Sequence, residues 1–223
     1  MKSSIRSHFL AVAFTGLAGF LLSSSATFGQ LFRVNIATTP LTLPANSASA
    51  PFSLDFQLNS GSTLNNNTAL LSNFTFSGGG APFGVANTFG GAGGSLPGAI
   101  TLSDTLAFNE FFQSFTPGSI LSFDLHLSQN VDAGPTPDGF SVSLLDGSLF
   151  NLPTTGFADQ LLTINILGAN PSIQTFAGTG SYAGVSLSIV AIPEPSTYGL
   201  IAASVLLVGI VVRRRRVAKI STV

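Results

Sequence analysis

Asp132 and Asp138 flank a short segment of alanine, glycine, proline and threonine, and Gly139 follows the second aspartate. Carboxylate and carbonyl oxygens are the ligands that Ca²⁺ prefers, so the loop is a candidate calcium site. Its residue order differs from the Asp-x-Asp-x-Asp-Gly of an EF-hand loop, and the alternative is that both aspartates cap turns. We therefore expect no cofactor, with Ca²⁺ at Asp132 and Asp138 as the one candidate.

The parts needed for nucleophilic catalysis are missing between residues 30 and 191. The chain has no cysteine, and His126 is the sole histidine in this range. Asp124 lies two residues before His126, so a strand would place both on one face, where they could share a proton or a cation. The alternative is two exposed polar residues on a solvated sheet. One histidine cannot complete a zinc site, which needs several His or Cys ligands.

Paired carboxylates are the remaining catalytic arrangement, because glycosidases need two of them at a suitable separation. Glu110 with Asp124, or Glu110 with Asp159, would supply such a pair. Any acidic sandwich offers such pairs by chance, so we predict no catalytic residues. A secreted, carboxylate-dependent glycan hydrolase is the alternative.

Apolar residues alternate with polar ones through much of the chain, which is typical of half-buried antiparallel strands. The alternating segments are residues 32–36, 52–58, 121–127, 140–144, 162–166 and 185–189, with weaker candidates at 71–76 and 100–106. Turn sequences such as Asn59-Ser60-Gly61 and Pro137-Asp138-Gly139 separate them. We predict an all-β, jelly-roll-like antiparallel β-sandwich over residues 30–191, with an open barrel as the alternative.

A glycine-rich stretch covers residues 78–94. It lacks the Lys-Ser/Thr of a phosphate-binding loop, and no helical pattern follows it. We predict a mobile surface loop that Phe83 and Phe89 attach to the sandwich.

Both ends of the chain carry apolar segments. Residues 1–29 combine Lys2 and Arg6, an apolar run and a small polar end, the three regions of a secretory signal peptide. Near the other end, Pro193, Glu194 and Pro195 precede a charge-free segment that predicts a transmembrane helix over residues 196–212. Arg213, Arg214, Arg215 and Arg216 follow directly, and a basic cluster marks the cytoplasmic end of a helix. The predicted sandwich is thus flanked by a signal helix and a transmembrane helix.

Charge is divided sharply along the chain. Arg33 is the one Lys or Arg between residues 30 and 191, whereas all nine Asp and Glu lie between Asp55 and Glu194. Nucleic-acid binding needs basic contacts to phosphates, so this acidic segment excludes that class of partner.

The tail over residues 192–223 resembles the PEP-CTERM sorting domain of exported bacterial proteins in its Pro193-Glu194-Pro195, apolar helix and arginine block. The resemblance implies that an exosortase processes the chain near these prolines, after the secretion machinery has inserted it as a single-pass inner-membrane intermediate. Delivery to the cell surface or extracellular matrix would follow. A looser similarity over residues 121–146 is to short PEP-CTERM proteins of unknown function.

Three functions are consistent with the sequence. The first is a non-enzymatic structural or binding component of an exopolysaccharide or biofilm matrix, with exopolysaccharide as an expected partner. The second is the secreted glycan hydrolase. In the third, the tail helix is retained and the protein remains a single-pass membrane-anchored protein.

Overall fold

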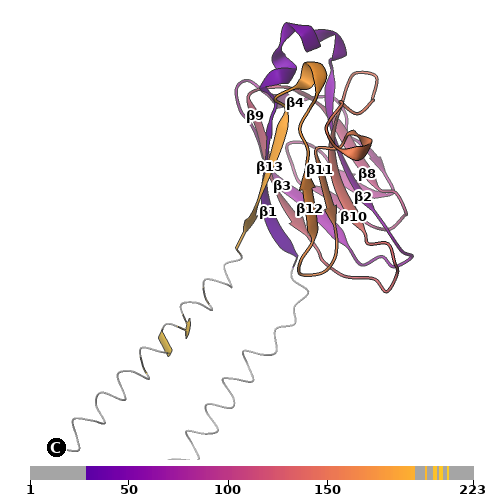
Figure 1. The fold of residues 1–223 in the computed structure, drawn as a ribbon, viewed down its shortest axis with the longest axis vertical. Coiled ribbons are helices and arrows are strands. Elements are labelled where there is room, and N and C mark those ends of the chain that lie inside the picture. Colours follow the sequence, from indigo (N-terminus) through magenta and orange to yellow (C-terminus); the bar gives the residue numbers. More distant parts are fainter. Residues whose placement is uncertain (1–28, 194–198, 200–202, 205, 208–209, 211–223) are drawn as a thin grey trace, which may run out of the picture.

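The structure is a computed structural model that describes residues 29–193, 199, 203–204, 206–207 and 210. The first of these ranges forms two antiparallel β-sheets, A and B, packed face to face (Figure 1). Among the described residues, no helix is long and apolar enough to cross a membrane. Most of the predicted helix over 196–212, the basic cluster at 213–216 and the signal peptide up to residue 28 lie outside the described residues.

Sheet A has six strands in the order β13-β1-β9-β3-β7-β6. Their bounds are β1 (Gln30–Ala37), β3 (Thr68–Phe76), β6 (Gly91–Gly94), β7 (Ile100–Ser103), β9 (Ile120–Leu127) and β13 (Ser186–Ile192). β1 lies next to the β13 edge of this sheet, and it pairs with β13 on one side and with β9 on the other.

Sheet B has seven strands in the order β12-β11-β10-β2-β8-β4, and β5 also pairs with β8. Their bounds are β2 (Phe52–Asn59), β4 (Ala81–Pro82), β5 (Asn87–Phe89), β8 (Glu110–Thr116), β10 (Gly139–Leu145), β11 (Leu162–Asn165) and β12 (Ser172–Thr175). Four short 3-10 helices complete the fold: η1 (Thr39–Thr42), η2 (Pro44–Ser49), η3 (Phe157–Asp159) and η4 (Gly180–Tyr182).

Phenylalanine rings fill much of the space between the sheets. Phe56 of sheet B meets Phe123 of sheet A edge to face, with ring centroids 5.3 Å apart, and Phe74 stacks on Phe123 at the same separation. Aromatic pairs prefer these offset or edge-to-face arrangements. The alternation predicts which face of each strand is buried, and the burial of these rings confirms a two-sheet antiparallel sandwich.

All eight segments expected to form strands do so, but the expectation of a mobile loop at residues 78–94 is wrong. β4, β5 and β6 all come from this stretch, where β4 and β5 extend sheet B and β6 extends sheet A. Phe89 packs against Phe108, with ring centroids 5.9 Å apart. Glycine reduces strand propensity, but here backbone pairing along β7 and β8 holds the segment in place.

Candidate functional site

The two junctions of the sandwich with its flanking segments lie side by side. Leu31 at the start of β1 pairs with Ile192 at the end of β13 in an unbroken antiparallel register. Figure 1 shows the two strands together, with these ends at the same end of the sandwich and η1 and η2 at the opposite end. Pro193 follows β13 directly, whereas Glu194 and Pro195 lie outside the described residues.

Asp132 and Asp138 meet a group of asparagines at this same end of the sandwich. Asn67 is 1% exposed, and its side-chain amide donates to Asp138 Oδ2 at 2.7 Å and to the backbone oxygen of Asn130 at 2.9 Å. Asp132 accepts hydrogen bonds from the Asn66 amide and the Ser62 hydroxyl. The structure therefore brings the two aspartates into one network, which also contains polar residues of the loop before β3.

Asp104 adds a third carboxyl to this network. Its Oδ2 accepts from the backbone N–H groups of Asn66 and Asn67, at 3.2 and 3.0 Å. Burial, together with the nearby Asp138 carboxyl, raises the pKa of Asp104, although the two backbone hydrogen bonds act against the shift. No sequence pattern groups Asp104 with the loop at residues 132–139, because 28 or more residues separate them.

The oxygens of the two predicted calcium ligands already have partners. Asp138 Oδ1 accepts from Gly61 N at 2.7 Å, and each of the other three carboxylate oxygens of Asp132 and Asp138 accepts a hydrogen bond from a side chain. Within the described part of the chain, no group of three or more His, Cys, Asp or Glu side chains is placed to hold a metal ion. The arrangement joins three loops that are distant in the sequence, a role that neither the calcium prediction nor the turn-cap alternative gave these aspartates.

A second carboxyl pair lies on the outer face of sheet B, where Glu110 of β8 lies beside Asp55 of β2. Gln57 Nε2 donates to Asp55 Oδ2 at 2.9 Å and to Glu110 Oε1 at 3.3 Å. Asp55 is 1% exposed, and among the described residues its Oδ1 has no hydrogen-bond partner. Burial, with a smaller contribution from the charge of Glu110, raises the pKa of Asp55 to about 7. Burial also raises the pKa of Glu110.

The carboxylates that the sequence suggested as partners of Glu110 lie elsewhere. Asp124 is on the outer face of sheet A, where it forms an ion pair with Arg33 at 2.9 Å and accepts from Asn73. These hydrogen bonds lower the pKa of Asp124 against the opposing effect of burial. Asp159, the last residue of η3, accepts a hydrogen bond from the backbone N–H of Thr154. Glu110 and Asp124 therefore lie on the outer faces of different sheets and do not form a pair.

His126 and Asp124 are both on the outer face of sheet A, as the strand pattern requires. The charged partner of Asp124, however, is Arg33, which is directly opposite it in the register of β1 and β9. The His126 side chain is exposed. This geometry favours the interpretation of a solvated sheet face over a His–Asp dyad.

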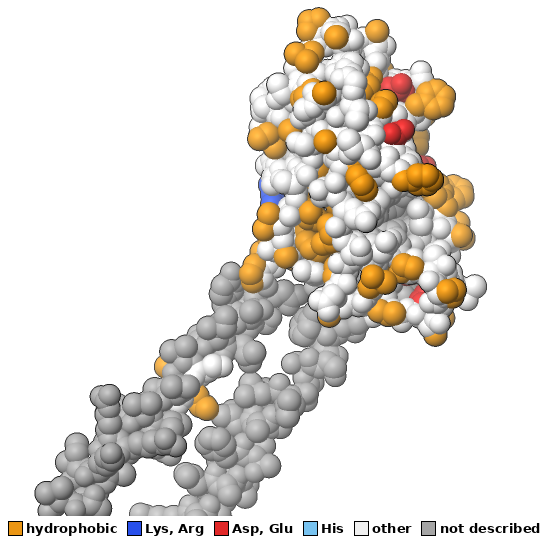
Figure 2. Space-filling model, viewed as in Figure 1, with side chains coloured by type: hydrophobic (Ala, Val, Ile, Leu, Met, Phe, Trp, Pro, Cys, Tyr) orange, Lys and Arg blue, Asp and Glu red, His pale blue; other side chains and the backbone are white. Residues whose placement is uncertain are grey.

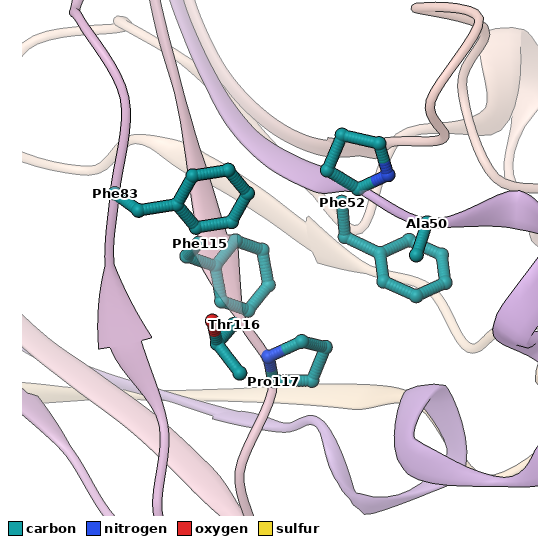
Figure 3. Close-up of a pocket in the computed structure, with 7 residues that line it drawn as sticks. Ala50, Phe52, Phe83, Phe115, Thr116 and Pro117 are labelled. Carbon is teal, nitrogen blue, oxygen red and sulfur yellow. The ribbon is translucent and has the colours of Figure 1, made fainter.

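A shallow apolar cavity of about 270 Å³ opens near the end of the sandwich that carries η1 and η2. Figure 3 shows Phe83 and Phe115 on one side of it and Phe52 on the other. Ala50, Pro51, Thr116 and Pro117 complete the lining. Since Thr116 contributes the one side-chain hydroxyl, this cavity suits an apolar group better than a sugar, which needs several hydrogen-bonding partners.

Comparison with known families identifies the tail and leaves the sandwich without a match. Residues 191–216 match the PEP-CTERM protein-sorting motif, which includes the last two residues of β13. The motif marks an exported protein whose membrane-anchored sorting signal an exosortase recognises. No curated protein and no solved structure matches the chain significantly.

Proposed function

We propose that this protein, which carries a PEP-CTERM sorting motif, is a non-enzymatic component of the bacterial cell surface or extracellular matrix. The observation that carries the proposal is the motif at residues 191–216, which begins in the last two residues of the sandwich's final strand. Exopolysaccharide is the proposed binding partner. Exosortase processing near Pro193 is proposed to release the sandwich from the predicted helix at 196–212.

The position of the two termini supports this function. β1 begins and β13 ends at one end of the sandwich, so a membrane-inserted tail would hold that end toward the bilayer. The opposite end, with η1, η2 and the apolar cavity, would then project away from the membrane. A single cut close to Pro193 would free the whole sandwich, because the outermost strand of sheet A is complete at Ile192.

The surface chemistry is consistent with a neutral, hydrated polymer as partner. Charged side chains are sparse on the face shown in Figure 2, and apolar side chains are scattered over it. Phe157 is 97% exposed and Phe150 is 71% exposed. Sugars commonly stack on exposed rings, so these two phenylalanines are the proposed contacts for polysaccharide.

Processing can be tested by measuring the intact mass of the protein recovered from the cell surface and from the medium. We expect the main species to end near Pro193 in cells with an active exosortase, and to keep its tail in cells without one. A main species that retains Arg213–Arg216 in exosortase-positive cells would instead establish a permanent single-pass membrane protein.

Binding and hydrolysis can be separated with the polysaccharide secreted by the same bacterium. We expect the protein to co-sediment with the polymer, and the double variant Phe150→Ser/Phe157→Ser to lose most of this binding. The matched control is Leu149→Ser, which changes an exposed apolar residue beside Phe150. Release of new reducing ends, abolished by Glu110→Gln or Asp55→Asn, would support the hydrolase instead.

A further inference from the structure

Three of the four outer edges of the two sheets are short and interrupted. β6 is four residues long and three of them are glycine, and β12 is four residues long and follows Pro171. β4 contains only Ala81 and Pro82. Short edges and edge prolines prevent strands from pairing with another chain, so these three edges are protected.

β13, the fourth edge, has none of these protections. It spans seven residues, Ser186–Ile192, without charge or proline, and it pairs with β1 over its full length without a bulge. On the outer side, Ser186 forms an isolated bridge to Ala177, but no described strand pairs with Leu187–Ile192. Val190 is 61% exposed. Alternate backbone N–H and C=O groups of this edge therefore point away from the sheet, ready to pair.

We propose that the β13 edge pairs antiparallel with the β13 edge of a second copy of this chain, which joins two six-stranded sheets into one. Two identical antiparallel strands are related by a two-fold axis, so the edge is its own complement. The outward side chains are Ser188, Val190 and Ile192, which carry no charge that would repel a second copy. Cross-strand contacts between β-branched side chains would add to the backbone hydrogen bonds.

The direction of β13 determines which copies can pair. This step rests on the proposed function, in which the tail anchors the chain until processing releases it. The sorting motif begins at Ala191, so β13 of every anchored copy runs toward the membrane. Two copies in one membrane therefore hold β13 in the same direction, and an antiparallel pair needs one copy inverted. Pairing is thus prevented between copies held in one membrane, and it is open to copies that processing, or extraction into detergent, has freed from that membrane.

Single-cysteine crosslinking tests the geometry, since the natural chain has no cysteine. The purified full chain in mild detergent would carry Ser188→Cys or Val190→Cys, alone and mixed, with Leu70→Cys as the control. Leu70 is also exposed, but it lies on β3 in the interior of sheet A. We expect one combination of the β13 positions to crosslink strongly and the control not to. Crosslinking at every position alike, or at none of the β13 combinations, overturns the proposal.

A charge on the edge provides the second test. We expect Val190→Lys to weaken dimerisation at least about tenfold in sedimentation experiments, because two like charges would lie close to the two-fold axis. Leu70→Lys should leave dimerisation unchanged, and both variants should melt like the unmodified chain. A monomeric unmodified chain, or equal dimerisation of Val190→Lys, contradicts the pairing.

The link to release is tested on cells that express the best-crosslinking variant. We expect disulfide-linked dimers among tail-less copies and not among copies that keep the tail. Equal crosslinking of tail-less and tail-bearing copies would contradict the proposal that pairing depends on release. Intact mass measured on the same samples reports exosortase processing separately, so a failure of sorting is not confused with a failure of pairing.

Discussion

Asp55 and Glu110, on neighbouring strands of sheet B, share one hydrogen-bond donor, the side-chain amide of Gln57. One amide nitrogen cannot satisfy the negative charges of two carboxylates, and Asp55 is almost completely excluded from water while Glu110 is half-buried. A carboxyl pair of this kind retains one proton near neutral pH, because the charged form of Asp55 is disfavoured by burial and by Glu110. The pair makes the stability of the sandwich depend on pH.

The sandwich should be more stable at pH 5 than at pH 8. The folded-state pKa of Asp55, about 7, lies above its ordinary value of 3.8, so its contribution to stability is complete below about pH 4 and is lost as pH rises through 7. The loss is on the order of 4 kcal/mol over this range. The lowered pKa of Asp124 has the opposite effect, but only below its own ordinary value. Urea unfolding at pH 4, 5, 6, 7 and 8 measures the trend.

Asp55→Asn should remove most of this pH dependence and make the protein more stable than the unmodified chain at pH 8. The amide keeps the shape of the carboxyl group but has no charge to bury. Glu110→Gln is the matched control, and it should keep the dependence while moving it to lower pH, because it removes only the smaller, electrostatic part of the Asp55 shift. An unmodified chain with the same free energy of unfolding at pH 5 and pH 8 would contradict both expectations.

Asn67→Ala should destabilise the loops beside the two termini by about 2–4 kcal/mol. The substitution removes the hydrogen bonds to Asp138 Oδ2 and to the Asn130 carbonyl, and it leaves the Asn130 N–H without its acceptor. Asn65→Ala changes an exposed neighbour and should have little effect. Thermal unfolding measures both variants, and equal melting temperatures would show that the network contributes nothing.

Calcium should leave the melting temperature unchanged, because the carboxylate oxygens of Asp132 and Asp138 already accept hydrogen bonds from the neighbouring loops. A ligand that binds only the folded state must raise this temperature. Differential scanning calorimetry in millimolar Ca²⁺ and in chelator decides the question. A higher melting temperature in Ca²⁺ that Asp132→Asn abolishes would establish the calcium site instead.

The sequence predicts the sandwich because alternation reports directly which side of a strand is buried. It predicts much less of the polar sites, which join residues that are distant in the chain. Arg33 and Asp124 are 91 residues apart, and they meet only because β1 and β9 are neighbours in register. Asp55 could not be recognised as part of a site from the sequence. Its polar side chain falls on the side of β2 that the alternation predicts to be exposed, but the structure buries it.

β8 shows why some strands were missed. Phe111, Gln113 and Phe115 all face the core, so a glutamine interrupts the apolar side of the alternation. Glu110 and Phe112 lie on the other face, where Phe112 is only half buried. A polar residue at a core position is tolerated where the fold supplies its hydrogen bonds, which a periodicity analysis cannot detect.

Gln113→Leu should therefore destabilise the protein, although it would restore the apolar pattern of β8. Gln113 Oε1 accepts from the backbone N–H of Leu96 at 2.8 Å, and its Nε2 donates to the Gly84 carbonyl at 3.1 Å. Leucine would leave the Leu96 N–H buried without a partner, at a cost of about 1–3 kcal/mol that its extra apolar area offsets only in part. The Gln113 side chain therefore connects β8 to the segment at residues 81–96, which contains β4, β5 and β6. Chemical unfolding should show a lower stability for Gln113→Leu than for the control Gln174→Leu, which makes the same change at an exposed position of β12. A stabilised Gln113→Leu would mean that the apolar pattern outweighs these two hydrogen bonds.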